Sequence, residues 1–402
     1  MDLSYCTNVH PAEDLDGVLD QLARYAGPAR RAAGLDRLGV GLWLPAPLAR
    51  QLATDDSARE RLRAGLAVDG LEVRTINAFP YTAFHAEVVK LDVYRPDWTD
   101  LRRAEYTLDC ASVLADLLPE GADGSISTLP LAWRTPWTTD DDERAEAVLA
   151  IVSAGLRELR GRTGRTIRLA IEPEPGCVLD TVADVVAWLA PRLSRDGAAE
   201  PGRIDGEFVG ICLDACHLAV SFADPEAAVR AVGAAGIRIP KIQASAALHV
   251  ESPADPDARA ALREFAEPRY LHQTRAATAA GVVAADDLPE ALDGLPDDAP
   301  WRVHFHVPLH LAPAAPLAST TDVLRRAVAA VRELPDGDTA HLDVETYTWA
   351  VLPGGVDDLA KGIAAELRWA AGVLLGDAED GGGAPVSAPA SASASAVEAV
   401  AS

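Results

Sequence analysis

The chain has 402 residues, of which 49% are hydrophobic, so it can bury a large core in one big domain or in two smaller ones. It carries 36 lysines and arginines against 61 aspartates and glutamates, and the formal charge of −25 argues against binding to nucleic acid or to an anionic membrane surface. Five cysteines without a Cys-x-x-Cys pair favour reduced thiols, and the sequence predicts neither a membrane span nor a signal peptide. We therefore expect a soluble, cytoplasmic protein.

Strand-like and helix-like segments alternate along the chain, and this alternation is typical of a parallel sheet with helical connections. The predicted strands cover residues 3–7, 38–44, 71–79, 125–131, 167–172, 208–214, 237–243 and 341–345. The predicted helices cover residues 15–25, 48–66, 98–118, 143–159, 181–189, 225–232 and 356–375. The chain advances by 33 residues from Leu44 to Asn77 and by 29 from Asp214 to Gln243, close to the roughly 30 residues of one unit in a (β/α)8 TIM barrel.

The segment between Gln243 and Glu345 is too long for one barrel unit and contains a further strand-like run at residues 301–309. We predict that residues 248–313 form an elaborated loop after the seventh strand, a lid over the barrel mouth in which 303–307 is an added strand or arm. The alternative is that 301–309 is a barrel strand and an earlier strand is wrong. Residues 1–375 would form one domain, and the Gly-, Ala-, Ser- and Pro-rich residues 376–402 a disordered tail.

Four predicted strands end on a side chain that offers an oxygen ligand, and these residues are Glu172, Asp214, Gln243 and Glu345. Because the carboxyl ends of barrel strands meet at one face, we expect these side chains to converge. Such a set favours Mn²⁺ or Mg²⁺, and Zn²⁺ is also compatible with it. A divalent ion would hold the crowded carboxylates ionised and polarise a substrate carbonyl or hydroxyl, while carboxylates on either side move a proton at the neighbouring carbon.

Other candidate contacts have an ordinary structural explanation beside the functional one. His304 and His306 share one face of an extended segment and either complete a metal site or satisfy polar groups in the lid. Asn77 ends the third predicted strand, and Glu174, after Pro173, is expected to be a loop charge. Aromatic residues near strand ends either wall an apolar pocket or belong to the core, and these are Trp43, Phe79, Trp301 and Trp349.

The order Glu, Asp-x-x-His, Gln, Glu on successive strands resembles the xylose-isomerase-like superfamily, and within it the hydroxypyruvate isomerase and tagatose epimerase branch. This resemblance implies that Glu172 and Glu345 act as acid and base as well as metal ligands. It further implies that Asp214 and Gln243 are metal ligands and that His217 contacts the substrate. The long segment after strand seven departs from the sugar epimerases, so substrate specificity is not carried over.

Four motifs more closely resemble the EboE-type metabolite-traffic proteins, and they occupy residues 3–11 (LSYCTNVHP), 214–217 (DACH), 303–310 (VHFHVPLH) and 345–349 (ETYTW). This resemblance implies a barrel protein acting in the biosynthesis or trafficking of an exported, prenylated secondary metabolite. Its small-molecule substrate would be a polyol or a prenylated metabolite. Protein partners from the same biosynthetic cluster and a homo-oligomer are compatible with it.

Three functions are thus open at this point. The first is a metal-dependent isomerase or epimerase, and the second is a non-catalytic metabolite-binding or carrier barrel. The third is a zinc phosphoesterase resembling endonuclease IV. The acidic charge and the presence of Asn77 and Leu129, where that enzyme needs histidine ligands, argue against the third.

Overall fold

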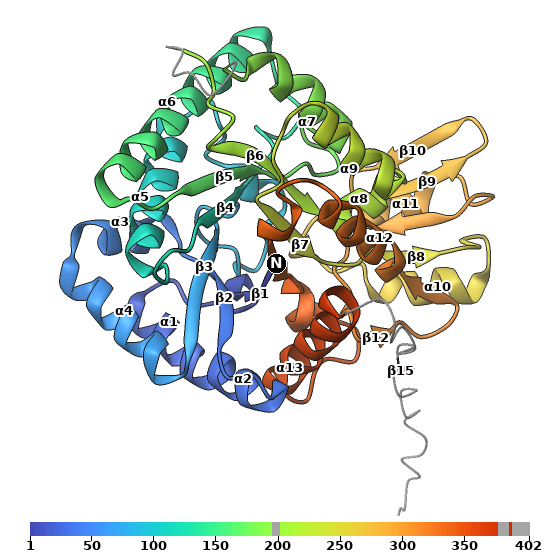
Figure 1. Cartoon of the computed structure of the whole chain (residues 1–402). Helices are drawn as coiled ribbons and strands as arrows, with labels where there is room; N and C mark the ends of the chain where they lie inside the picture. The colour runs from blue at the N-terminus through green and yellow to red at the C-terminus, as the bar shows by residue number, and fades with distance from the viewer. Residues whose placement is uncertain (195–201, 377–385, 388–402) are drawn as a thin grey trace, which may run out of the picture.

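The computed structural model describes residues 1–194, 202–376 and 386–387. Eight parallel strands close into a barrel in the order β1-β14-β7-β6-β5-β4-β3-β2 (Figure 1). They are β1 Asp2–Cys6, β2 Leu38–Trp43, β3 Leu71–Asn77, β4 Gly124–Thr128, β5 Ile167–Ile171, β6 Val209–Asp214, β7 Lys241–Ala244 and β14 His341–Val344. The (β/α)8 barrel predicted from the alternation of segments is therefore confirmed.

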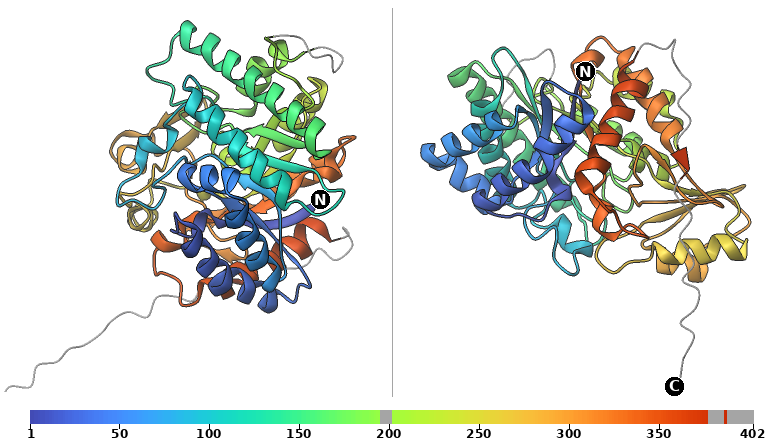
Figure 2. Two further views of the ribbon diagram at one scale, coloured as in Figure 1. Left: turned by 90° about the vertical axis from the view of Figure 1, so that its left-hand side faces the viewer. Right: turned by 90° about the horizontal axis from the view of Figure 1, so that it is seen from below.

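Helices surround this barrel and cover the outer faces of its strands (Figure 2). They are α1 Leu15–Gln21, α2 Gly27–Ala33, α3 Ala46–Thr54, α4 Asp56–Val68, α5 Leu101–Leu117, α6 Thr139–Thr163, α7 Val182–Leu189, α8 Ala215–Val220, α9 Pro225–Ala234, α12 Thr321–Arg332 and α13 Leu359–Ala370. Within the described residues, no helix has the length and apolar character needed to cross a membrane.

Local hydrogen-bonding residues explain where several helices begin. Asp14 accepts a hydrogen bond from the Gly17 amide and starts α1. Asp55 accepts from two amides of the following turn, so the single helix predicted over 48–66 is in fact two helices, α3 and α4. The prediction also missed α12, although its buried residues Val323, Ala327 and Val331 follow helical spacing.

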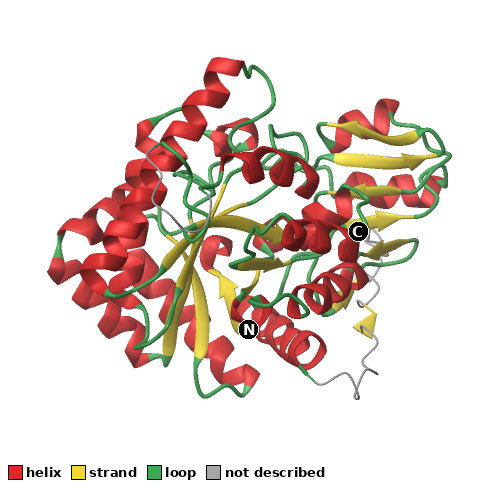
Figure 3. Ribbon diagram, turned by 45° about the horizontal axis from the view of Figure 1, so that its top comes forward, coloured by secondary structure: helices red, strands yellow, loops and turns green. Residues whose placement is uncertain are grey.

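The long segment after β7 builds a second, five-stranded antiparallel sheet in the order β10-β9-β11-β8-β13. Its elements are β8 Leu248–Val250, α10 Pro256–Glu264, β9 Thr274–Thr278, β10 Gly281–Ala285, α11 Leu288–Gly294, β11 Trp301–Val303 and β13 Leu317–Ser319. This sheet lies to one side of the barrel (Figure 3). Residues 301–303 therefore belong to the added sheet and not to the barrel, and the sheet extends to Ser319, beyond the predicted limit at residue 313.

The short strand β12 (Leu311–Ala312) pairs in parallel with β15 (Val386–Ser387). The disordered tail predicted over 376–402 falls mainly on residues 377–385 and 388–402, which lie outside the described residues.

The centre of the barrel is polar, whereas branched apolar residues usually dominate such interiors. Lys241 and Asp343 are both fully buried, with 2.9 Å between Lys241 Nζ and Asp343 Oδ2. Ser4 Oγ donates to Asp343 Oδ1 at 2.6 Å, and Lys241 Nζ donates to Ser127 Oγ at 3.3 Å. A Cβ atom at Gly41 would lie only 2.2 Å from Asp343 Oδ2, so glycine on β2 makes room for this buried ion pair.

Candidate metal centre

The carboxyl ends of the barrel strands surround a cavity of about 60 Å³, which has room for a few water molecules or the reacting part of a small ligand. Its polar lining residues are Asn8, Asn77, Glu172, Glu174, His217, His304, His306 and Glu345. Its largely apolar wall consists of Phe79, Pro80, Phe84, Val89, Val93, Tyr94, Tyr270, Leu271 and Tyr347, with Lys90 beside them. Polar groups are therefore gathered at one end of a pocket whose remaining surface is mostly apolar.

A wider depression lies at the opposite end of the barrel, where Arg168, Arg238 and His341 contribute to its lining. Arg168 pairs with Glu207, and Arg238 pairs with Asp336. Both arginines therefore already have carboxylate partners among the described residues.

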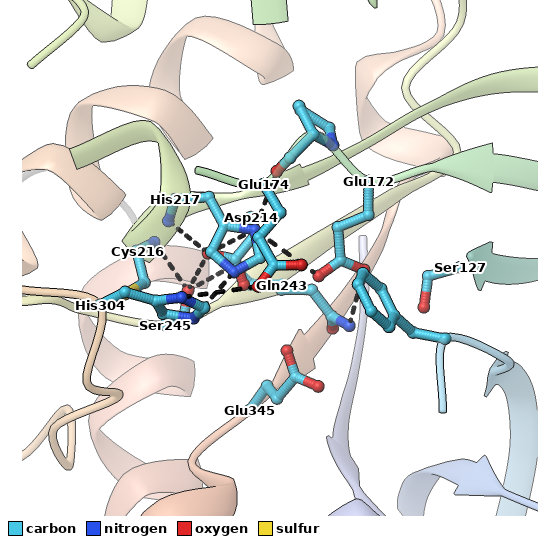
Figure 4. Close-up of polar contacts among 12 residues, drawn as sticks. Ser127, Glu172, Glu174, Asp214, Cys216, His217, Gln243, Ser245, His304 and Glu345 are labelled. Atoms are coloured by element: carbon cyan, nitrogen blue, oxygen red, sulfur yellow. Dashed lines mark hydrogen bonds and ion pairs between the residues drawn. The ribbon is translucent and has the colours of Figure 1, made fainter. Parts of the chain in front are cut away.

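The four oxygen-bearing residues predicted from the strand ends are brought together (Figure 4). Glu172 follows β5, Asp214 ends β6, and Glu345 follows β14, and one oxygen of each lies within 4.8 Å of the other two. Gln243 on β7 points its amide toward them, with Nε2 3.5 Å from Glu172 Oε2. Barrel closure thus converts four sites that are distant in sequence into one cluster.

The two oxygens of Asp214 have different roles. Asp214 Oδ1 accepts from the His217 amide at 2.7 Å, which starts α8, and from Ser245 Oγ at 3.0 Å. Asp214 Oδ2 is buried and has no hydrogen-bond partner within the described part of the chain. Helix capping and metal binding are consequently compatible at this residue, because each uses a different oxygen.

Two asparagines orient Glu345. Asn8 Nδ2 donates to Glu345 Oε1 at 2.7 Å, and Asn77 Nδ2 donates to the same oxygen at 2.8 Å. Asn77, which the sequence predicts as a contact residue, therefore hydrogen-bonds to the Glu345 carboxylate and orients it. Asn8, in the loop after β1, was not identified from the sequence, although it lies in the 3–11 motif.

Burial and neighbouring negative charge disfavour ionisation of Glu172 and Glu345. Burial, followed by the charge of Asp214, raises the pKa of Glu345 to about 8. Burial, followed by the charges of Glu345 and Asp214, raises the pKa of Glu172 well above its usual value. The buried Lys241 ammonium partly offsets both increases in pKa. A divalent cation would remove the remaining repulsion and lower these pKa values.

The raised pKa of Glu345 predicts a pH dependence of stability in the metal-free protein. Between about pH 5 and pH 8 the folded state keeps a proton on Glu345 that the unfolded state has released, so rising pH lowers the free energy of unfolding. Relative to Glu345→Gln, the wild-type protein should lose about 1.4 kcal/mol of stability per pH unit across this window. Urea unfolding in the presence of a chelator measures this difference, which equal slopes in the two proteins would contradict.

Three histidines lie beside the carboxylates. His217 is in the first turn of α8, whereas His304 and His306 follow β11 in the segment that connects β11 to β13. His217 Nε2 and His304 Nε2 are 3.1 Å apart, and His306 Nε2 is 3.9 Å from Asp214 Oδ2. Burial lowers the pKa of His304 well below its usual value and that of His306 to about 4. Both rings are therefore neutral at pH 7 and able to act as ligands.

Several buried polar atoms of this cluster lack a hydrogen-bond partner, and they show whether the cluster fits a cation. Asp214 Oδ2, Gln243 Oε1 and His306 Nε2 are all buried and lack a partner among the described residues. Buried polar atoms normally have partners, and all three offer lone pairs. A cluster of histidine, aspartate and glutamate with such unpaired acceptors fits a divalent metal ion.

Glu174 lies in a loop, as the sequence predicts, but its surroundings differ from those expected of a loop charge. It is buried in the pocket, where Glu174 Oε1 accepts from Tyr94 Oη at 2.8 Å and from Gln273 Nε2 at 3.2 Å. The signal that could have identified it is its spacing of two residues from Glu172. Because Gln273 lies in the inserted segment just before β9, no local sequence pattern indicated this pairing.

The aromatic candidates separate into two groups. Phe79 lines the pocket, whereas Trp43 and Trp349 are absent from its lining. The Trp43 indole donates to the Pro80 carbonyl, and the Trp349 indole donates to Glu366. These two tryptophans therefore pack next to the site and do not form its wall, because each ring is anchored by a hydrogen bond to another partner.

The fold and these side chains define a (β/α)8 barrel protein with a metal-competent centre at the carboxyl ends of its strands. No protein-family model and no curated protein matches the sequence.

Similar solved structures include three proteins with low sequence identity. The IOLI protein, solved with a zinc atom, is 12% identical with a TM-score of 0.49, over 93% of this chain and 98% of that protein. A xylose isomerase domain protein from Alicyclobacillus acidocaldarius is 14% identical with a TM-score of 0.43, over 91% and 95%. An AP endonuclease of family 2 from Brucella melitensis is 12% identical with a TM-score of 0.39, over 60% and 78%. Function must therefore be inferred from the side chains themselves.

Proposed function

We propose that this protein is a metal-dependent isomerase or epimerase that transfers a proton at the carbon next to a carbonyl or hydroxyl of a small polyol-like substrate. The observation that carries the proposal is the convergence of Glu172, Asp214 and Glu345, three buried carboxyl groups with one oxygen of each within 4.8 Å of the other two. Carboxyl groups placed around a metal-bound substrate can accept and return a proton as base and acid.

Glu172, Asp214, Gln243 and Glu345 would hold the metal ion, for which Mn²⁺ and Mg²⁺ are favoured. When bound, the metal supplies Lewis-acid polarisation of a substrate oxygen. Glu172 and Glu345 act as base and acid, and Asn8 and Asn77 fix the orientation of the Glu345 carboxylate. The buried surroundings exclude bulk water from these groups, which strengthens the electrostatic interactions among them.

The lining of the pocket supports a substrate with a polar and an apolar part. Hydroxyl groups of a polyol would meet the carboxylates and histidines, and an apolar group would lie along Phe79, Phe84 and Leu271. This division agrees with the trafficking role in prenylated secondary metabolism that the EboE-type motifs imply. We include that role, with a cytoplasmic location, in the proposal.

Exchange of the substrate proton with solvent deuterium tests the reaction. The metal-stripped protein is supplied with Mn²⁺ in deuterated water together with a panel of aldoses, ketoses and hydroxy-ketones, and loss of the α-proton signal is followed by nuclear magnetic resonance. We expect exchange on at least one compound that stops when a chelator is added. Saturable binding of a panel member without any exchange would overturn the proposal in favour of a non-catalytic carrier.

A further inference from the structure

The two asparagines that orient Glu345 are the only asparagines in the sequence. Asn8 and Asn77 both donate to Glu345 Oε1, and none of the other 400 residues is an asparagine. Asn77 is fixed by the barrel itself, because it ends β3 and its Oδ1 accepts from the Phe79 amide at 3.0 Å. The side-chain amide of Asn77 therefore has a partner on its oxygen as well as on its nitrogen.

Asn8 has less support from its own side chain. It lies in the 3₁₀ turn Thr7–Val9 that follows β1, beyond the residues of β1 that pair with β2. Asn8 Oδ1 is buried without a hydrogen-bond partner in the described part of the chain. Since its amide is bonded through the nitrogen and not through the oxygen, the position of the Asn8 side chain depends on what holds the backbone of the turn.

His85, in the loop after β3, holds that backbone. His85 Nε2 lies 2.7 Å from the Asn8 carbonyl oxygen. A carbonyl oxygen can only accept a hydrogen bond, so the donor is the Nε2–H group of His85. The His85 ring also lies beside Trp43, with 6.0 Å between the ring centroids, and it is absent from the lining of the pocket. His85 can therefore influence Glu345 through Asn8, without itself lining the pocket.

The segment that carries His85, residues 83–90, is also bound to the insertion after β7. The Lys90 amide donates to the Arg269 carbonyl oxygen at 3.0 Å, and Lys90 Nζ donates to the Tyr270 carbonyl oxygen at 2.7 Å. Phe84 of the same segment lines the pocket beside Tyr270, with 5.2 Å between the ring centroids. Residues 83–90 therefore connect the wall of the pocket and the insertion with the turn after β1.

We propose that His85 is a positioning residue for the isomerase or epimerase reaction, because its bond to the Asn8 carbonyl group keeps the Asn8 side chain against Glu345. The catalytic part of this inference rests on the proposed function, whereas the positioning of Asn8 does not. One series of contacts thus joins the segment that walls the pocket to the carboxylate that would move the proton. A displacement of about 1 Å at a reacting group can cost about 10²-fold in rate, so a contact outside the pocket is sufficient to affect catalysis.

Nuclear magnetic resonance of the two asparagine side chains tests this positioning directly. Protein labelled with ¹⁵N in asparagine alone gives two side-chain NH₂ pairs, and Asn8→Ser identifies the Asn8 pair by removing it. His85→Phe keeps an aromatic ring but has no N–H donor, whereas His85→Gln restores a donor. We expect the Asn8 Nδ2 protons to exchange with solvent about tenfold faster in His85→Phe, as for the loss of one hydrogen bond, and to return toward the wild-type rate in His85→Gln.

The Asn77 pair is the internal reference in every variant. Its protons should keep their wild-type exchange rate in His85→Phe, because β3 and the Phe79 amide hold Asn77 independently of His85. Unchanged exchange of the Asn8 protons in His85→Phe would overturn the proposal. Equal acceleration of the Asn8 and Asn77 protons would also overturn it, because it would indicate a general loosening of the site.

Deuterium exchange of the substrate separates this positioning from the proposed reaction. With saturating Mn²⁺ and substrate, His85→Phe should lower the exchange rate by about 10–10²-fold, and His85→Gln should recover most of it. The control is His249→Phe, which should keep the wild-type rate, because His249 lies on β8 outside the pocket and pairs with the exposed Glu251. A wild-type rate in His85→Phe would contradict the positioning role. If no compound of the panel exchanges in the wild-type protein, the proposed reaction fails, and the asparagine spectra still decide whether His85 positions Asn8.

Discussion

Glu172→Gln and Glu345→Gln should each lower the rate of deuterium exchange by about 10²–10⁴-fold, the usual contribution of a positioned acid or base. Glutamine keeps the size and much of the hydrogen-bonding capacity of glutamate but cannot accept the substrate proton. The rates are measured with saturating Mn²⁺, and metal content is determined in parallel, so that loss of the ion is distinguished from loss of the proton-transferring group.

The matched control is Glu366→Gln on α13. Burial raises the pKa of Glu366 to about 7, yet this carboxylate accepts from the Leu309 amide and from Thr346 Oγ1, outside the pocket lining. The exchange rate of Glu366→Gln should remain within about threefold of the wild-type rate. A buried carboxyl group with a raised pKa is not catalytic unless it also lies in the pocket. If both pocket variants retain wild-type exchange, Glu172 and Glu345 are not the acid and base.

Lys241→Met should lower the free energy of unfolding by about 3–5 kcal/mol, because removing one partner of a buried ion pair leaves the other charge unpaired. Burial alone would lower the pKa of Lys241, but the charge of Asp343 raises it overall, so the ammonium is charged. Urea unfolding of the metal-free protein at pH 7 measures the loss.

A double variant checks that the cause is the unpaired charge. Lys241→Met combined with Asp343→Asn removes both charges and should recover most of the stability lost in Lys241→Met. A single-variant loss below about 1 kcal/mol, as is typical of a solvated pair, would contradict the assignment of a buried ion pair. The single variant should also raise the pKa of Glu345 further, since Lys241 lowers it in the wild-type protein.

If these results hold, the site depends both on the fixed charge of Lys241 and on residues of the inserted segment. Tyr270 and Leu271 line the pocket from that insertion, and His304 and His306 approach from the segment that follows β11. The role of the insertion as a lid over the barrel mouth stays a prediction. The insertion contributes side chains directly to the pocket, and this contribution explains why the segment after β7 is so long.

The sequence by itself determined the barrel and the positions of the oxygen-bearing residues. Apolar periodicity is local, and the carboxyl ends of parallel strands must meet, so the sequence alone places Glu172, Asp214, Gln243 and Glu345 at one face. Helix boundaries were less well determined, as the break at Asp55 shows, because a single capping side chain decides them.

Only the tertiary structure decided which other residues lie beside these four oxygen-bearing residues in the site. The facing nitrogens of His217 and His304, the burial of Glu174 against Gln273, and the Lys241–Asp343 pair each join segments that are far apart in the chain. Such contacts depend on the path of the inserted sheet and on the register of the closed barrel. Neither the path nor the register can be recognised in a short stretch of sequence. The periodicity of apolar residues shows which face of a helix or strand is buried, but not which other segment packs against that face.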